Sequence, residues 1–281
     1  MKQNNKILLA YLYTCYDKAP SLIYFLKKYI ENKPGKKHEL LICLKLLKGK
    51  KLKEAISIIN KYTKKKIIYI DPCKFNDYDF GSYHRIALKY SDYQILFLNS
   101  HSAPEKGNWL KKISKFANKK TLIGSTASFS SYASNSFFRH KNDNYFEFLK
   151  KIILSNIYFS KFPNPHIRTS NFMVYGNEFL KFMKNNKKIM NKFDAHIIES
   201  GKRSLTNYFL KKRFKIFVVN SDAKKFKLSH TFKSQTFCTN NQKKLLISDK
   251  HSRLFNNYNL IEKKKMIKRV WGHFVNIKIW I

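Results

Sequence analysis

The chain has only four cysteines in 281 residues and no long apolar run. Cys15, Cys43, Cys73 and Cys238 lie far apart, with no C-x-x-C pair and no histidine at the spacing of a zinc finger. We therefore expect reduced, structural cysteines. No stretch approaches the roughly 18 consecutive apolar residues that a bilayer span needs. The apolar run behind the basic N-terminus also ends without a leader-type cleavage site. The sequence thus predicts a cytoplasmic protein that is not integral to the membrane.

Arginine and acidic residues are scarce as well. Of the 57 basic residues only seven are arginine, the acidic residues number 17, and the formal net charge is +40. Proteins that read nucleic acid favour arginine for its bidentate fork. Here scattered lysines accompany abundant asparagine, isoleucine, phenylalanine and tyrosine, a bias typical of AT-rich coding sequence. We expect no specific nucleic-acid partner, and a loose attraction to an anionic membrane surface.

Apolar periodicity indicates alternating strands and helices in the first third of the chain. The breakers Pro34-Gly35 and Asp71-Pro72 separate some of them. The expected strands are 6–13, 38–47, 66–70 and 93–98, and the expected helices are 21–30, 52–62 and 82–90. This order predicts an α/β fold with a mostly parallel sheet flanked by helices. We see no internal repeat, no low-complexity linker and no second domain.

Polar residues follow the fourth expected strand, in the stretch FLNSHSAP at 97–104. Ligands of parallel sheets bind in the crevice outside the carboxyl ends of the strands. Asn99-Ser100-His101-Ser102 are therefore candidates for a binding site. A plain polar turn after a strand is the alternative.

The order of these segments resembles the nucleotide-sugar glycosyltransferases of the GT-A fold, particularly the GT2-like bacterial surface-polysaccharide enzymes. The resemblance begins at DFGSY, 79–83, where the family has a small donor-contacting motif ahead of a helix. It continues in QILFLNSHSAPEKGNWLKKI, 94–113, where Pro104 and Trp109 match the proline and the tryptophan-containing helix that follow the family's Asp-x-Asp motif. The resemblance covers roughly Lys6 to Asp222 and is looser beyond. No single motif is diagnostic, and its strength is the order of the pieces.

The resemblance implies a single domain over 1–281, with a Rossmann-like donor nucleotide-binding half at 1–120 and an acceptor-binding half with a C-terminal cover at 121–281. The donor-binding residues that it implies are Tyr13, Asp79, Gly81, Arg85, Asn99 and His101.

Asn99 and His101 stand where the family has the two acids of Asp-x-Asp. In the family those carboxylates hold Mg²⁺ or Mn²⁺, which meets the charge that develops on the diphosphate leaving group. An amide and an imidazole suit a hard divalent ion far less well. Either the metal is dispensable, with Arg85, Arg168 or nearby lysines neutralising the phosphates, or the chain is a degenerate member of the family. We favour the first interpretation, assign no metal ligand and keep Mg²⁺ or Mn²⁺ as the alternative cofactor.

Two later segments correspond to the acceptor side of the family. Ser125 and Thr126 follow an expected strand that begins near Lys120, and small residues let backbone N–H groups approach hydroxyls or phosphates. In FPNPHIRTSNFMV, 162–174, His166 and Arg168 alternate with Ile167 and should point to one side. The resemblance implies that these four residues bind the acceptor. For His166, an exposed residue at the start of a strand is an equally good explanation.

An inverting transferase needs a carboxylate to take the proton of the acceptor hydroxyl. In the family this base precedes a helix and a strand, here expected at 204–212 and 214–219, and Glu199 fits that place. Asp194 is the second candidate and Asp222 the third. The structural alternative is a carboxylate that favours the start of a helix and pairs with Lys202 or Arg203.

Together these features predict a glycosyltransferase that moves a sugar from a nucleotide-sugar donor to a saccharide or lipid-linked acceptor, in surface polysaccharide or lipopolysaccharide synthesis at the inner face of the membrane. The rival interpretations are a catalytically weakened carbohydrate-binding relative and a basic nucleic-acid-binding protein. The tail at 262–272 reads as an amphipathic helix with Met266, Val270 and Trp271 on its apolar side. It either covers the sheet or, with Gln235, Asn241 and Asp249, borders the acceptor cleft.

Overall fold

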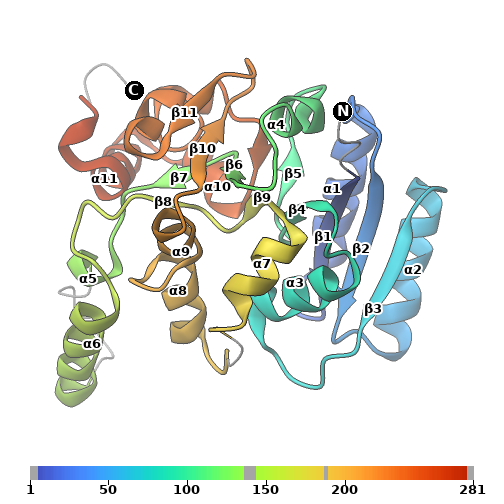
Figure 1. The fold of residues 1–281 in the computed structure, drawn as a ribbon, viewed down its shortest axis with the longest axis horizontal. Coiled ribbons are helices and arrows are strands. Elements are labelled where there is room, and N and C mark those ends of the chain that lie inside the picture. The colour runs from blue at the N-terminus through green and yellow to red at the C-terminus, as the bar shows by residue number, and fades with distance from the viewer. Residues whose placement is uncertain (1–5, 136–143, 187–188, 277–281) are drawn as a thin grey trace.

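The computed structural model describes residues 6–135, 144–186 and 189–276, and it contains a mixed sheet with helices on both faces (Figure 1). The strand order is β11-β10-β6-β9-β4-β1-β2-β3. These strands are β1 (Ile7–Thr14), β2 (Glu39–Lys45), β3 (Ile67–Asp71), β4 (Gln94–Leu98), β6 (Thr121–Gly124), β9 (Asn171–Tyr175), β10 (Lys215–Val219) and β11 (Lys225–Lys227). Four neighbouring pairs are parallel, while β9 runs antiparallel to both β4 and β6, and β11 runs antiparallel to β10. The predicted α/β class with a mostly parallel sheet is confirmed.

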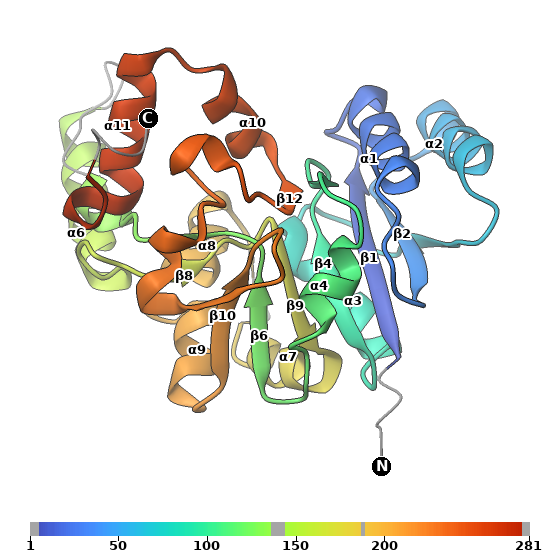
Figure 2. The same cartoon turned by 90° about the horizontal axis from the view of Figure 1, so that it is seen from above.

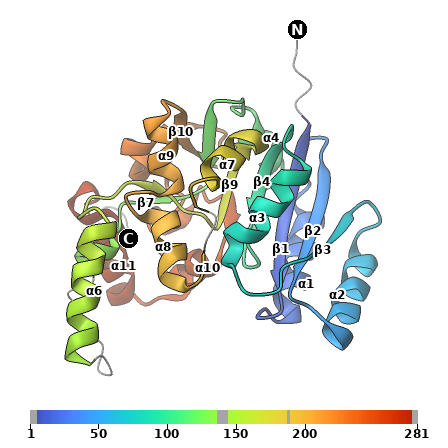
Figure 3. The same cartoon turned by 60° about the horizontal axis from the view of Figure 1, so that its bottom comes forward.

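Alternation along β1 divides the core between the two faces of the sheet. Leu8, Ala10 and Leu12 point into one apolar cluster, and Leu9 and Tyr11 point into the other. Helices of opposite faces cover these clusters, as Figure 2 and Figure 3 show from two sides. The first face is covered by α3 (Tyr78–Lys89), α7 (Gly176–Met183), α8 (Lys192–Ser200) and α9 (Leu205–Lys211), and the second by α1 (Ala19–Glu31), α2 (Gly49–Tyr62) and α4 (Trp109–Ser114).

A third apolar cluster lies under the C-terminal helices, where Phe129, Phe237 and Trp271 are buried together. The amphipathic helix predicted for the tail is present, with Val270 and Trp271 buried. The elements outside the main sheet are β5 (Ala103–Pro104) paired with β12 (Ile247–Ser248), β7 (Ala127–Ser128) paired with β8 (His166–Ile167), α5 (Tyr132–Asn135), α6 (Tyr145–Tyr158), α10 (Lys250–Asn257), α11 (Leu260–Trp271), and the 3₁₀ turns η1 (Leu228–Ser234), η2 (Asn240–Gln242) and η3 (Gly272–Phe274). None of the described helices is both long and apolar enough to cross a bilayer.

The strands and helices expected in the first third of the chain are all present, and the largest shift of a boundary is at the start of α3. Helix α3 begins at Tyr78, earlier than the expected Ser82. The backbone N–H of Tyr78 donates to the Asn76 side chain, and Asp79 lies in the first turn, where a negative charge is favoured by the helix dipole.

Strand β9 determines how the binding edge of the sheet is built. Because β9 is antiparallel to β4 and β6, it begins at the edge where those strands end. The residues that precede β9 therefore meet the residues that follow β4 and β6. This edge carries the polar segments singled out in the sequence.

Candidate functional site

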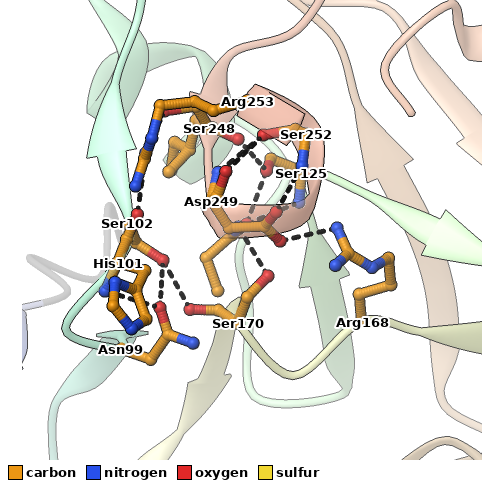
Figure 4. Close-up of polar contacts among 12 residues, drawn as sticks. Asn99, His101, Ser102, Ser125, Arg168, Ser170, Ser248, Asp249, Ser252 and Arg253 are labelled. Carbon is orange, nitrogen blue, oxygen red and sulfur yellow. Dashed lines mark hydrogen bonds and ion pairs between the residues drawn. The ribbon is translucent and has the colours of Figure 1, made fainter. Parts of the chain in front are cut away.

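The segment after β4 is a hydrogen-bonded turn fastened to the start of β9. Asn99 donates its backbone N–H to the Ser170 carbonyl at 2.9 Å, and Ser102 donates its hydroxyl to the same carbonyl at 2.8 Å. The Asn99 side-chain oxygen accepts hydrogen bonds from the His101 backbone N–H at 3.2 Å and from the Ser102 hydroxyl at 2.9 Å. The turn is thus held rigidly at the predicted edge (Figure 4).

A carboxylate that the sequence did not single out, Asp17, joins this turn from the end of β1. It accepts the Ser100 hydroxyl at 2.8 Å and lies 3.6 Å from His101 Nε2. Its other oxygen accepts both the backbone N–H and the hydroxyl of Thr14, at 2.9 and 2.7 Å. Burial lowers the pKa of His101. The Asp17 carboxylate raises it, but burial together with the Arg253 and Lys250 charges outweighs this effect, so we expect the imidazole to be neutral near pH 7.

These side chains do not fit a hard divalent metal. Oxygen ligands of Mg²⁺ or Mn²⁺ must be free to face the ion, but the Asn99 oxygen and both Asp17 oxygens accept internal hydrogen bonds. In the described parts of the chain, no group of three or more His, Cys, Asp or Glu side chains is placed to hold a metal ion.

Arg253 supplies a cation at the same edge. Its guanidinium donates to the His101 carbonyl at 2.9 Å and to the Ser248 hydroxyl at 3.0 Å, and it lies 4.9 Å from the centre of the Tyr24 ring. Arg253 belongs to α10, so the C-terminal part of the chain closes over the turn that follows β4.

Arg168 and Asp249 form the next link, an ion pair of 2.6 Å (Figure 4). Asp249 is also the N-cap of α10 and accepts from the Ser252 N–H at 2.8 Å and from the Ser170 hydroxyl. Burial raises the pKa of Asp249, but Arg168 and these hydrogen bonds outweigh it and lower the pKa to about 2. The Arg168 guanidinium also stacks on Phe237, 3.7 Å from the ring centre. Both charges are thereby fixed in place.

Arg168 lines a cavity of about 340 Å³ together with Glu199, His166 and His251. As the alternation predicted, His166 and Arg168 face the same side, and both are nearly buried. His166 Nδ1 lies 2.8 Å from the Asn164 carbonyl, and burial lowers the pKa of His166. With Nδ1 as the donor in that contact, Nε2 remains as an acceptor toward the cavity. The described residues that line the cavity are Ser128, Ser130, Ser131, Tyr132, Lys151, His166, Arg168, His196, Glu199, Ser200, Phe237, His251, Met266, Arg269 and Val270.

Glu199 is the only acidic side chain among the described residues of this lining. Burial raises the pKa of Glu199. This effect is outweighed by the His196 ring, 3.7 Å away, and by His166 and Arg168, which together lower the pKa to about 2. The carboxylate is therefore ionised at every physiological pH. It remains 35% exposed, so a ligand in the cavity can reach it.

The position of Glu199 differs from the expected one. It lies in the last turn of α8 and not in a loop ahead of α9. Its partner is His196 and not Lys202. Lys202 instead donates to the Asn156 carbonyl at 2.9 Å. Asp194 sits in the first turn of the same helix, where it completes a capping box with Asn191. The structure therefore gives Asp194 a capping function and leaves Glu199 alone at the cavity.

The predicted donor residue Arg85, on α3, belongs to a separate ion cluster. Arg85 donates to Asp71 at 2.5 and 2.8 Å and to Asp77 at 2.5 Å, and Lys45 donates to Asp77 at 2.5 Å and to the Tyr78 carbonyl. Arg85 is thus occupied by two carboxylates, contrary to the expectation of a cation available for phosphates.

Gly81 and Asp79 lie beside that cluster. A Cβ on Gly81 would stand 2.0 Å from the Asp77 carboxylate, which explains glycine here without a ligand. Burial raises the pKa of Asp79 to about 6. Tyr13 is almost buried and packs in the second core cluster. Donor contacts of Asp79, Gly81 and Tyr13 stay predictions.

Of the predicted acceptor residues after β6, Ser125 is bound internally. Its hydroxyl donates to the Asn171 side chain at 2.5 Å. The buried Thr126 hydroxyl has no hydrogen-bond partner among the described residues. Neither residue lines the cavity that contains Glu199.

Sequence reasoning missed several residues of the site. The Asp249-x-x-Ser252 pattern, a capping box, could have placed His251 and Arg253 on a helix start, because such boxes are readable from sequence. No local pattern indicates that Asp17, His196 and Arg269 approach the other polar groups, since their neighbours are distant in the chain.

Glycosyltransferases are among the solved structures with a similar course of the chain. One is the apo form of the bifunctional glycosyltransferase WbbM, with a TM-score of 0.41 and 9% identity, covering 71% of this chain and 37% of that one. Another is the galactosyltransferase LgtC in complex with donor and acceptor sugar analogues, with a TM-score of 0.43 and 9% identity, covering 76% and 73%. No family model and no curated protein sequence matches. At this identity the likeness concerns the fold alone, and this chain spans only about a third of WbbM.

Proposed function

We propose that the chain is a GT-A-type glycosyltransferase that moves a sugar from a nucleotide-sugar donor to a saccharide or lipid-linked acceptor, in surface polysaccharide or lipopolysaccharide synthesis at the cytoplasmic side of the membrane. One observation carries the proposal. A continuous polar network runs from the turn after β4, through Ser102 and Ser170, to the Asp249–Arg168 pair and the cavity that holds Glu199.

The two ends of this network suit the two substrates. Breaking the bond between the anomeric carbon and a diphosphate leaves negative charge on the leaving group and oxocarbenium character on the sugar. Arg253 is a fixed cation near the turn and has no carboxylate partner among the described residues, and we assign it to offset the phosphate charge without a metal ion. Fixed charges need no reorganisation during the reaction.

At the other end, Glu199 would accept the proton of the acceptor hydroxyl in a single, inverting displacement. A carboxylate with a pKa of about 2 is always ionised but is a weak base. A protonated His166 lowers the pKa of Glu199, and this effect disappears when the imidazole is neutral. Burial favours the neutral form of His166. Glu199 is therefore a stronger base near pH 7, where His166 is neutral, than at low pH, where His166 is protonated.

A catalytically weakened carbohydrate-binding protein is the second candidate. It is favoured by the internally bound oxygens of Asn99 and Asp17, which leave no metal-type contact for a diphosphate.

Calorimetric titration with UDP, GDP and single-stranded RNA, followed by an assay for sugar transfer from the nucleotide sugar that binds, separates the interpretations. The proposal expects saturable nucleotide binding and turnover. Saccharide binding without nucleotide binding or transfer would favour the weakened relative. Tight RNA binding at physiological salt, without nucleotide affinity, would favour the nucleic-acid binder.

A further inference from the structure

Helix α6 carries a row of apolar side chains that the fold leaves uncovered. Phe146 is 78% exposed, Leu149 38%, Ile153 59% and Ile157 55%. Spacings of three and four residues place all four on one side of the helix. We call these four residues the α6 stripe.

The inner side of α6 already packs on the protein. Ser155 is completely buried, and Phe148 and Ile152 are half-buried. The α6 stripe therefore adds a second apolar face, which the helix does not need for its own packing. A contiguous exposed apolar face of this kind marks an interaction surface. Other exposed apolar residues, such as Leu88 on α3 and Ile261 on α11, belong to helices whose buried residues account for their packing.

The position and charge of α6 indicate what covers the stripe. The helix lies at one end of the molecule, away from β3 and α2, and extends from the body (Figure 1 and Figure 3). Lys150 is exposed on the same helix, and the whole chain carries +40. A cationic protein with an apolar helical face is complementary to an anionic bilayer surface, where such helices lie in the plane of the headgroups. With 14 residues, α6 is too short to span the bilayer.

We propose that α6 docks on the surface of an anionic lipid bilayer, with the α6 stripe inserted at the level of the headgroups. Lys151, on the side of α6 opposite the stripe, lines the cavity that contains Glu199. Docking through α6 thus holds that cavity about one helix diameter, roughly 10 Å, above the level of the stripe. If the proposed function holds, this position suits a lipid-linked acceptor.

Vesicle co-sedimentation tests the docking without any sugar donor. The full chain is mixed with vesicles of phosphatidylcholine alone or with a third of phosphatidylglycerol. We expect binding to the anionic vesicles, and Phe146→Ser with Ile153→Ser should lower the partition coefficient by about 10²-fold. The matched control Leu88→Ser with Ile261→Ser removes two equally exposed apolar residues elsewhere and should leave binding unchanged.

Two further measurements keep the test decisive. Hydrogen exchange should slow in α6 when anionic vesicles are added, and light scattering should give the same molar mass for the wild type and the stripe variant. Vesicle binding that the stripe variant retains would overturn the proposal, because scattered lysines would then suffice. A wild type that ignores anionic vesicles, or a wild-type dimer that the stripe variant converts to a monomer, would also overturn it. Binding to vesicles without sugar transfer would count against the proposed function alone.

Discussion

Arg168 and Asp249 face each other at 2.6 Å, and each side chain is nine-tenths buried or more. One precedes β9 and the other begins α10, so the pair joins the main sheet to the C-terminal helices. It also links the turn after β4 to the cavity. The same contact therefore holds the two halves of the candidate site in a fixed relation.

Replacing Glu199 by glutamine should abolish most of the turnover. The substitution keeps the shape of the side chain and removes the charge, so the rate should fall by about 10²–10⁴-fold while nucleotide affinity changes little. Steady-state kinetics and calorimetry on the same preparation measure both quantities.

The matched control is Asp194→Asn, which alters a carboxylate on the same helix but away from the cavity. It keeps an oxygen that can accept the Asn191 N–H but removes the negative charge from the first turn of the helix, so it should cost about 0.3–1 kcal/mol of stability and leave turnover nearly intact. Equal activity of Glu199→Gln and the wild type would remove Glu199 from the mechanism.

Sugar transfer should persist in the presence of EDTA. The oxygens of Asn99 and Asp17 are engaged internally, and Arg253 supplies fixed positive charge. Initial rates are measured in EDTA and across a Mn²⁺ titration. A steep, saturable requirement for Mn²⁺ would refute metal independence.

Acid should weaken the fold through Asp249. Its pKa is about 2 in the folded protein against 3.8 ordinarily, so the unfolded chain binds the proton more readily. The stabilisation, about 2 kcal/mol, is complete above about pH 4 and is lost as the pH falls toward 2. Urea unfolding of the wild type and Asp249→Asn across pH 2–6 checks this. The two stability curves should converge at low pH, and parallel curves would contradict the assignment.

Gly81→Ala should destabilise the protein although alanine favours helices. The new Cβ would stand 2.0 Å from the Asp77 carboxylate, which Lys45 and Arg85 hold in place. Disturbing a buried ion pair lowers the free energy of unfolding by about 3–5 kcal/mol, while the higher helix propensity of alanine over glycine raises it by about 1 kcal/mol. We expect a net loss of about 2–4 kcal/mol by urea unfolding. Gly107→Ala, with no atom near the added Cβ, should be neutral.

The sequence predicted the first half of the sheet well because the signals there are local. Apolar runs, helix periodicity and the breakers at Pro34 and Asp71 lie within each segment. The polar turn at Asn99 was found for the same reason, since it directly follows a buried strand. The five-residue strand β9 gave no comparable indication that it runs antiparallel between β4 and β6.

The rest of the site depends on contacts that no local pattern reveals. Asp17 approaches Ser100 only because β1 and β4 are neighbours, and Arg253 reaches His101 only because α10 packs on that edge. The position of Glu199 inside a helix has a local cause that can be read from the sequence. Asn191 and Asp194 form the capping box that begins α8, and this helix continues to Ser200.

The cavity lining, drawn from β7, α5, α6, β8, α8, α10 and α11, has a consequence for folding. Pairing of β1, β2, β3 and β4 involves segments that are close in sequence, so this part can form early. The cavity forms only after C-terminal segments that are distant in sequence pack near β6 and β9. Contacts between distant segments form more slowly, because a long loop must close first. An early intermediate would carry the turn after β4 while lacking the lining around Glu199. Because Arg253 also comes from α10, such an intermediate would gain nucleotide affinity only in the step that also completes the cavity around Glu199.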